Sequence, residues 1–247
     1  MIKKIIFLIC NIFINNNIII KFKNSKLKNL EYNYDFLNVS FEDLNNSKKI
    51  LFSNKYLNTK DKFYDESSIN YHTFNWLFAA KKIGGAEVVA IAKKQIFNWN
   101  NKTYKITSFV WNINYVAKRL ISLIYNFDFY AISSTIKEKK IYKMMIVKHF
   151  FILNLQTKII KNINYQSIEV NKALLLFSLI NKLQHTKILK LINNQIRYNV
   201  DENGFHKSIN PCLQAEYINH LYEIKNMCLF FKLEPSNEIK FQIMNMS

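Results

Sequence analysis

The chain has 247 residues, of which 49% are hydrophobic and 15% aromatic, and this composition can bury a sizeable core and excludes an intrinsically disordered protein. An excess of 35 Lys and Arg over 17 Asp and Glu gives a formal net charge of +18, which would ordinarily indicate nucleic acid or another polyanion as a partner. Only two of the basic residues are arginines, and Asn, Ile and Lys are abundant while Gly and Pro are scarce, as AT-rich coding produces. We therefore interpret most lysines as solvated helix faces and consider a nucleic-acid partner disfavoured.

The N-terminal part of the chain divides into two predicted segments. Residues 1–20 begin with Lys3 and Lys4 and continue with an apolar run, which is typical of either a signal peptide or a buried first helix. Residues 21–66 are polar and Asn-rich without a sustained period, so we expect an irregular lead-in with one short strand around Lys49 to Phe52. These features leave the localisation open between cytoplasm and periplasm.

From residue 67 to residue 247 the hydrophobic pattern changes to a helical period. Gly84 and Gly85 can supply a left-handed cap between the first two predicted helices. The predicted helices span residues 71–83, 87–99, 111–127, 132–160, 168–183, 186–198 and 213–232. Because these helices follow one another through short connections and no internal repeat is evident, the sequence predicts an all-α domain of stacked antiparallel helical hairpins.

The chemistry-bearing motifs are few. The three cysteines, Cys10, Cys212 and Cys228, lack the spacing of a metal site or of a disulfide framework, and no Walker loop, dinucleotide-binding turn or zincin motif occurs. We therefore assign neither a metal ligand nor a cofactor. One stretch, Asn203 to Pro211, stands out because it combines a Gly, a His and a Pro in a chain that contains 3 Gly, 5 His and 2 Pro.

Several short motifs together resemble the heparinase II/III-like family. They are the stretch Tyr71-His72-Thr73-Phe74-Asn75-Trp76-Leu77, the pair Gly84-Gly85, Trp99, Trp111, the run Ala117 to Ser122, and the turn Asn203-Gly204-Phe205-His206 to Asn210-Pro211. In that family an H-x-F-x-W-L helix precedes two Trp-bearing helices, and a D-G-G-H-x-x-R-N-P turn follows later. The resemblance covers about residues 48 to 240.

This resemblance implies a fold and an activity. The fold would be the N-terminal part of a bacterial polysaccharide lyase, an incomplete α/α toroid that normally precedes a β-sandwich domain. The lyase members abstract the C5 proton of a uronic acid once its carboxylate is neutralised, and the C4 oxygen then leaves by β-elimination. Such a site needs a neutralising Asn, His or Arg and an acid–base pair of Tyr or His.

The chain departs from the family pattern at the turn. Asn203, Phe205 and Ile209 replace the Asp, the second Gly and the Arg of the family motif. The Tyr that lyase members carry after the turn is absent at that position, and Tyr217 stands one helical turn further on. Only a short stretch follows the last predicted helix, so we expect the β-sandwich to be missing from this chain and to come, if present, from a separately encoded partner.

The resemblance and the residue types give eight candidate site residues. The catalytic candidates are His206 and Tyr217, and the substrate-binding candidates are Asn203, Asn210, Arg119, Tyr71, His72 and Asn171. Each also has a structural interpretation. His206 can be a turn residue that caps the next helix, Asn210 an N-cap before Pro211, His72 a helix-packing residue, and Arg119 the partner of Asp128 in an internal salt bridge. The three tryptophans fit core positions better than sugar-stacking platforms.

Two hypotheses for function follow. The first is the toroid domain of a heparinase II/III-like lyase, which binds acidic, uronate-containing glycans and is incomplete as a catalyst alone. The second is a noncatalytic helical scaffold or partner-binding protein whose positive charge reflects codon bias. The two differ in where the candidate residues fall, because a glycan cleft requires His206, Asn210, Arg119, Tyr71 and His72 to line one concavity.

Overall fold

The computed structural model describes residues 69–102, 109–159 and 167–246, so the predicted segments 1–20 and 21–66 and the predicted strand around Lys49 lie outside it. Within these ranges every regular element is a helix, which confirms the predicted all-α class, and one isolated β-bridge joins Val200 and His206. The helices are α5 (Ile69–Thr73), α6 (Trp76–Ile83), α7 (Ala86–Asn101), η3 (Phe109–Trp111), α8 (Ile113–Tyr125), α9 (Phe127–Ala131), α10 (Ile136–Ile159), α11 (Ile168–Ile180), α12 (Thr186–Asn199), α13 (Pro211–Phe230) and α14 (Asn237–Met246).

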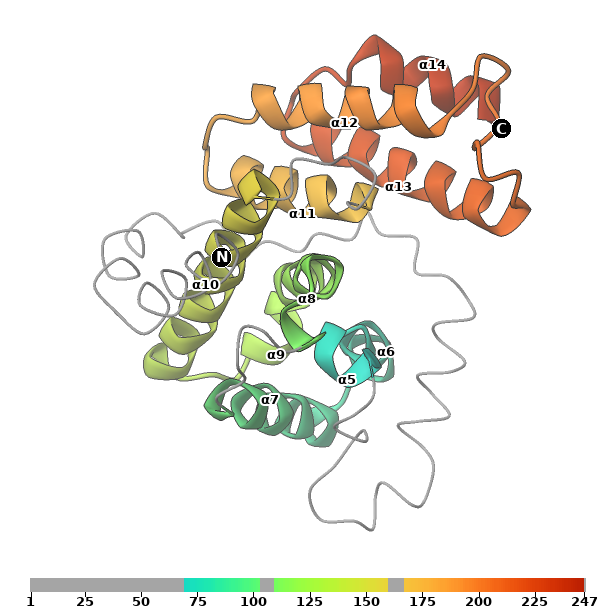
Figure 1. Ribbon diagram of the computed structural model, residues 1–247. Coiled ribbons are helices and arrows are strands. Elements are labelled where there is room, and N and C mark those ends of the chain that lie inside the picture. Colours follow the sequence, from blue (N-terminus) through green and yellow to red (C-terminus); the bar gives the residue numbers. More distant parts are fainter. Residues whose placement is uncertain (1–68, 103–108, 160–166, 247) are drawn as a thin grey trace.

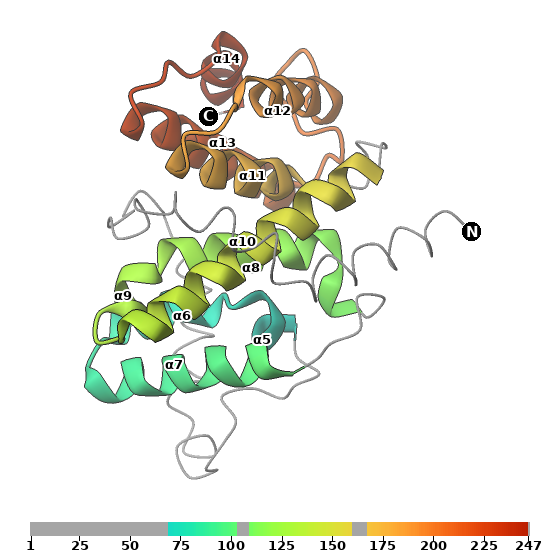
Figure 2. The same ribbon diagram turned by 90° about the vertical axis from the view of Figure 1, so that its left-hand side faces the viewer.

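The helices form two packed groups that meet at α11. In the first group α8 is central and contacts α5, α6, α9, α10 and α11, while α7 packs on α6 and α9 (Figure 1). In the second group α11 packs on α12 and α13, and α14 packs on both α12 and α13 (Figure 2). Among the helices of the described ranges, none is both long enough and apolar enough to cross a bilayer.

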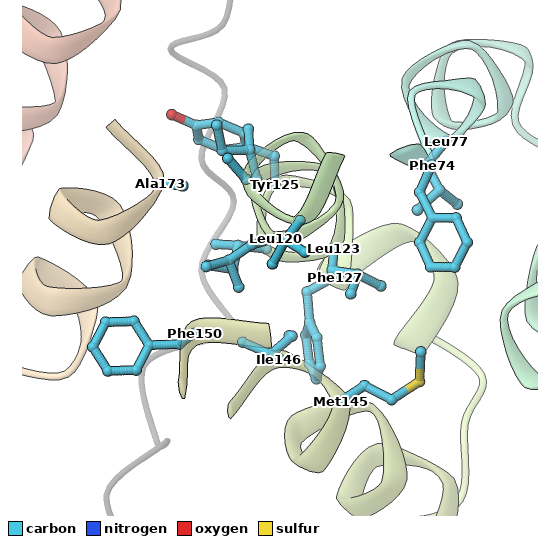
Figure 3. Packing of buried hydrophobic residues seen from close by; sticks show 14 of the residues in the cluster. Phe74, Leu77, Leu120, Leu123, Tyr125, Phe127, Met145, Ile146, Phe150 and Ala173 are labelled. Carbon is cyan, nitrogen blue, oxygen red and sulfur yellow. The ribbon is translucent and has the colours of Figure 1, made fainter. Parts of the chain in front are cut away.

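Each group has its own hydrophobic core. In the first core, side chains of α8 meet those of α5, α6, α9, α10 and α11, and Leu120 and Leu123 of α8 lie between Phe127, Ile146 and Ala173 (Figure 3). In the second, α11, α12, α13 and α14 bury Leu175, Ile196, Leu221 and Ile243 among others. Burying apolar area on this scale is the main favourable term for folding.

Helix α11 belongs to both cores. All residues of α11 except Glu169 are buried. Its Leu174 and Leu176 pack in the first core, whereas Leu175 and Leu179 pack in the second. Apolar residues on several faces of a helix bury it on several sides. The buried polar residues Asn171 and Lys172 pair with Gln195 and Glu223 of the neighbouring helices.

The predicted helix 71–83 is wrong in one respect, because the structure breaks it into α5 and α6. Phe74 has φ 61°, in the left-handed region that non-glycine residues rarely adopt. Its ring is fully buried and makes edge-on contacts with Trp76 and Trp99. The left-handed conformation costs about 1–2 kcal/mol, and burying a Phe side chain, worth about 1.5–3 kcal/mol, offsets this cost.

The predicted helix 111–127 is also divided. Helix α8 ends at Tyr125, and α9 begins at Phe127. The side chain of Asn126, which is fully buried, donates from Nδ2 to the carbonyl oxygen of Ser122 at 2.9 Å. The backbone N–H of Asn126 also donates to this carbonyl, at 3.3 Å, so the side-chain bond is a second contact that closes the C-terminal end of α8.

Helix α10 begins at Ile136, four residues later than predicted, because a capping box sets its start. The backbone N–H of Thr135 donates to Glu138 Oε2 at 2.7 Å, and the backbone N–H of Glu138 donates to Thr135 Oγ1 at 3.2 Å. This reciprocal pair is a strong N-terminal signal. Lys93 of α7 also pairs with Glu138, at 3.3 Å, and so attaches this end of α10 to α7.

The cap predicted before the C-terminal helices is confirmed. Asn210 Oδ1 accepts from the backbone N–H groups of Cys212 at 2.9 Å and Leu213 at 3.4 Å, and Pro211 is the first residue of α13. The predicted left-handed glycines are also confirmed, since Gly84 has φ 67° and Gly85 has φ 88°. Helix α14 was not predicted.

We expect Gly204→Ala to destabilise the protein more than Gly85→Ala. Both glycines have positive φ, 83° and 88°, so both substitutions carry the backbone cost of about 1–2 kcal/mol. A Cβ at residue 204 would lie 2.7 Å from the backbone oxygen of Asn245 in α14, whereas a Cβ at residue 85 meets no atom within 4 Å. Overpacking adds about 1–3 kcal/mol at residue 204. Urea unfolding of the two variants measures the difference, and equal losses would contradict the close approach to α14.

Candidate functional site

The turn that carries the family-like motif lies between α12 and α13, and its backbone is fixed by hydrogen bonds. We call residues 203–211 the rim turn. Asp201 Oδ1 accepts from the backbone N–H groups of Asn203 and Phe205, both at 2.9 Å. Gln214 of α13 donates from Nε2 to the carbonyl oxygen of Gly204 at 3.0 Å. Residues 203–205 of the rim turn are therefore fixed both by Asp201, which precedes them, and by Gln214 of α13.

His206 is the partly exposed ionisable residue of the rim turn. Its backbone N–H donates to Gln214 Oε1 at 2.6 Å. Its Nδ1 accepts from the backbone N–H of Ser208 at 3.3 Å and lies 2.7 Å from Ser208 Oγ. Because Nδ1 is the acceptor, the proton of the neutral ring is on Nε2. Partial burial lowers the pKa of His206 below its usual value, so the neutral ring is favoured.

Tyr217 packs directly beneath His206. The two ring centroids are 5.2 Å apart in an edge-on arrangement. Tyr217 is buried in the second core, and burial raises the pKa of its hydroxyl to about 12. The hydroxyl is consequently protonated at neutral pH and enclosed by the protein.

The two asparagines of the rim turn are both exposed. The side-chain oxygen of Asn210 is engaged in the cap of α13. Four of the eight predicted site residues, Asn203, His206, Asn210 and Tyr217, therefore gather at this turn.

Arg119 lies elsewhere, at the centre of the first core, and is completely buried. Its Nε donates to His149 Nε2 at 2.7 Å, its Nη1 to the carbonyl oxygen of His72, and its Nη2 to that of Val110 at 3.2 Å. The guanidinium carbon also lies 4.3 Å from the ring centroid of Trp99 and 5.1 Å from that of Trp111. The predicted alternative partner, Asp128, forms its ion pair with Lys81, at 2.9 Å.

The histidines around Arg119 are buried with it. His149 Nδ1 lies 2.7 Å from the carbonyl oxygen of Met145, so Nδ1 carries the proton and Nε2 accepts from Arg119. Burial, together with the charge of Arg119, lowers the pKa of His149 well below its usual value. Trp99 Nε1 donates to His72 Nδ1 at 3.1 Å. We call Arg119, His149, His72, Trp99 and Trp111 the guanidinium cluster.

Three predicted substrate contacts therefore lie in or beside the guanidinium cluster. Arg119 and His72 belong to it, and Tyr71 is buried with its ring 5.2 Å from that of His72. The prediction that the tryptophans are core residues is confirmed, since Trp76, Trp99 and Trp111 have relative exposures of 1%, 3% and 4%. Within the described part of the chain, no contact joins these side chains to the rim turn. The five residues expected to line one concavity therefore lie in two separate places.

Asn171 occupies a third position. It is buried in α11 and donates from Nδ2 to Gln195 Oε1 of α12 at 2.8 Å. This bond links two helices of the second group.

A charged cluster that the sequence prediction missed lies on α8, α11 and α13. The buried Lys172 pairs with Glu223 at 2.7 Å, and its Nζ is 2.9 Å from His220 Nδ1. Nε2 of the same histidine lies 3.8 Å from Glu169 and 3.7 Å from Glu216. The only local sequence signal is the four-residue spacing of Glu216 and His220, which puts both on one face of α13.

Comparisons with protein-family models, with curated proteins and with solved structures found no match. The likeness to heparinase II/III-like proteins therefore rests on the motif residues quoted above.

We expect Arg119→Lys to cost about 3–5 kcal/mol of unfolding free energy, because an ammonium cannot serve three acceptors in the geometry of the guanidinium and leaves buried groups unpaired. The matched control is Arg197→Lys. Arg197 is the other arginine, and its side chain is 67% exposed in an ion pair with Glu238, so its loss should stay below about 1 kcal/mol. Urea unfolding followed by tryptophan fluorescence measures both. Similar losses for the two variants would rule out a structural role specific to Arg119.

We also expect stability to fall as the pH is lowered from about 7 to about 5.5. The folded chain keeps His149 neutral because its pKa is lowered, whereas the unfolded chain takes up a proton below about pH 6.5. The unfolded state then binds more protons, and the free energy of unfolding decreases by up to about 1.4 kcal/mol per pH unit for this residue. His149→Gln should flatten this slope in urea titrations. An unchanged slope would assign the pH dependence to another group.

Proposed function

We propose that this chain is a heparinase II/III-like helical domain that contacts the carboxylates of an acidic glycan through the rim turn alone and has no lyase activity on its own. The five-residue cleft predicted from the sequence is wrong, because Arg119, Tyr71 and His72 are buried in the first core. The observation that carries the proposal is the contact between His206 and Tyr217 at an exposed turn. These residue types are those that β-elimination on a uronate requires, and their proximity was not evident from their separation in the sequence.

The hydrogen bonds of His206 suit carboxylate recognition. Since Nδ1 accepts from Ser208, the neutral ring offers Nε2–H as a donor to a carboxylate oxygen. Lys207, which is exposed beside it, adds a positive charge to the same turn. Hydrogen bonds to an ionised acceptor are the stronger class of such bonds.

Catalysis requires more than this pair provides. An acid must come within hydrogen-bond distance of the leaving C4 oxygen of the sugar. Tyr217 is only 6% exposed, so its hydroxyl cannot reach a sugar bound at the surface. Arg119, which could neutralise a carboxylate, has its donors directed at acceptors inside the first core. We therefore propose that the chain binds glycan without cleaving it, and that a β-sandwich partner would supply the remaining catalytic groups.

The motif residues of the first group support the family resemblance in another way, because they determine the fold rather than bind a ligand. His72, Trp99, Trp111 and Arg119 are separated in sequence, yet each contacts another member of this set, and Tyr71 packs on its sequence neighbour His72. A shared set of mutually dependent core contacts is a reason for such residues to recur together in a family. The incomplete α/α toroid implied by the resemblance belongs to this proposal, and the pairwise packing of α6 with α7, α11 with α12 and α13 with α14 is compatible with it.

A second candidate function, a noncatalytic partner-binding scaffold, is favoured by one observation. Large apolar side chains are exposed on and beside the rim turn, with Ile209 at 91%, Phe205 at 63% and Leu213 at 42% relative exposure. Ile209 also has φ 54°, which is unusual for a β-branched residue. Contiguous exposed apolar residues are typical of protein–protein contacts.

The test is to measure binding of the purified chain to a uronate polymer, with a sulfated polymer that lacks carboxylates as the control for net charge. We expect His206→Ala to weaken uronate binding at least tenfold, because it removes a hydrogen bond to a charged group, worth about 1.5–3 kcal/mol. The control variant His185→Ala, which removes the partly exposed histidine before α12, should bind as the wild type does. The ultraviolet absorbance of an unsaturated uronate product should stay at background.

Two results would decide against this function. If the sulfated polymer binds equally well and His206→Ala has no effect, the attraction is non-specific. If binding to both polymers is absent while Ile209→Ser and Leu213→Ser abolish association with a protein partner, the scaffold function holds. A clear lyase signal from this chain alone would contradict the incomplete site.

A further inference from the structure

The cluster at the junction of α11 and α13 contains a metal-type arrangement of donor atoms that involves no rim turn residue. Glu169 of α11 and Glu216 and His220 of α13 each present one ligand atom, and these atoms lie within 4.8 Å of one another. Helix α13 supplies two of them from positions four residues apart, which are neighbours on one helix face. The third comes from α11, which packs directly on α13.

The distances between these atoms are those of a coordination shell rather than of hydrogen bonds. His220 Nε2 is 3.8 Å from Glu169 Oε1 and 3.7 Å from Glu216 Oε1, both longer than the roughly 2.7–3.2 Å of an N–H···O bond. Ligand atoms bound tetrahedrally at about 2.1 Å from a zinc ion are about 3.4 Å apart. Shifts of a few tenths of an ångström would therefore bring His220 Nε2 to this distance from each carboxylate. The two carboxylate atoms lie within 4.8 Å of each other, and rotation of the exposed Glu216 side chain would bring them closer.

The two carboxylates of this cluster favour a cation, whereas the nearby lysines oppose it. Glu169 and Glu216 place two carboxylates around one imidazole nitrogen. Lys118, 3.5 Å from Glu169 Oε2, supplies the positive charge nearest to that carboxylate.

We propose that Glu169, Glu216 and His220 bind a divalent first-row transition-metal ion, for which zinc is the representative. An imidazole nitrogen selects this class over magnesium and calcium, which prefer all-oxygen sites. Three protein ligands leave the fourth position of a tetrahedral ion to water or a small ligand, as in zinc sites with a chemical role. The side chain of Glu216 is 55% exposed, so solvent reaches the site.

Binding requires a change of tautomer at His220. In the structure Nδ1 faces the ammonium of Lys172 at 2.9 Å, so the proton of the neutral ring is on Nε2. Coordination through Nε2 moves that proton to Nδ1, and Lys172 then keeps its ion pair with Glu223, at 2.7 Å. The ion also competes with Lys118 for Glu169. Both lysines therefore oppose the ion, and removing Lys118 should strengthen binding.

The experiment is isothermal titration of the untagged full chain with Zn²⁺, together with the visible absorption of the Co²⁺-loaded chain. We expect one ion per chain, and a Co²⁺ spectrum of low coordination number. Glu216→Gln should weaken binding at least tenfold, and His220→Asn should abolish it. Lys118→Met should bind more tightly than the wild type, because a competing charge is lost.

The controls separate this site from adventitious binding. Glu234→Gln, at an exposed carboxylate that pairs with Lys240, and His185→Ala should leave the affinity unchanged. Circular dichroism shows whether each variant is folded. Because the side chain of Glu216 is exposed, Glu216→Gln should disturb the fold least among the ligand variants. The proposal is overturned if Glu216→Gln and Glu234→Gln bind zinc equally, if Lys118→Met binds more weakly than the wild type, or if Mg²⁺ displaces Zn²⁺ at equal concentration.

Discussion

The first core is organised around one buried charge, the guanidinium of Arg119. Removing an ion of this size from water costs several kcal/mol unless its donors and its charge are satisfied. Here α8 carries the arginine, α10 supplies His149, the segments of α5 and η3 supply carbonyl oxygens, and Trp99 of α7 covers the guanidinium face. Five elements must therefore be in register at once. The positions of α8 and its neighbours are therefore defined more precisely than apolar packing alone would define them.

The bounds of a helix could be predicted where an unbroken hydrophobic period marks it. They could not be predicted where tertiary contacts break the helix within that period. Helices α7 and α12 match the predicted ranges closely, because an apolar face repeated at the helical period defines both. The break at Phe74 has no local signal, since Phe is not a turn residue, and the left-handed backbone is maintained by burial of its ring. The break at Asn126 likewise depends on a side-chain bond within a buried turn.

The candidate site was predictable in part, for a related reason. Rare residues drew attention to Arg119 and His206 alike, but rarity cannot distinguish a residue required by the core from one that contacts a ligand. That distinction depends on whether the side chain faces the core or the solvent. Arg119 is completely buried, whereas His206 is partly exposed. Glu169 and His220 are 51 residues apart, and only the packing of α11 on α13 brings them together.

The double burial of α11 restricts how chains of this kind can vary in length. Adding or removing one residue within the helix rotates everything beyond that point by about 100°. Leu174 and Leu176 would then turn out of one core as Leu175 and Leu179 turned out of the other. A helix with one solvated face can absorb such a rotation partially, but α11 has no such face. We therefore expect a chain with this arrangement to accept insertions and deletions in the connections on either side of α11, while the helix itself keeps its thirteen residues.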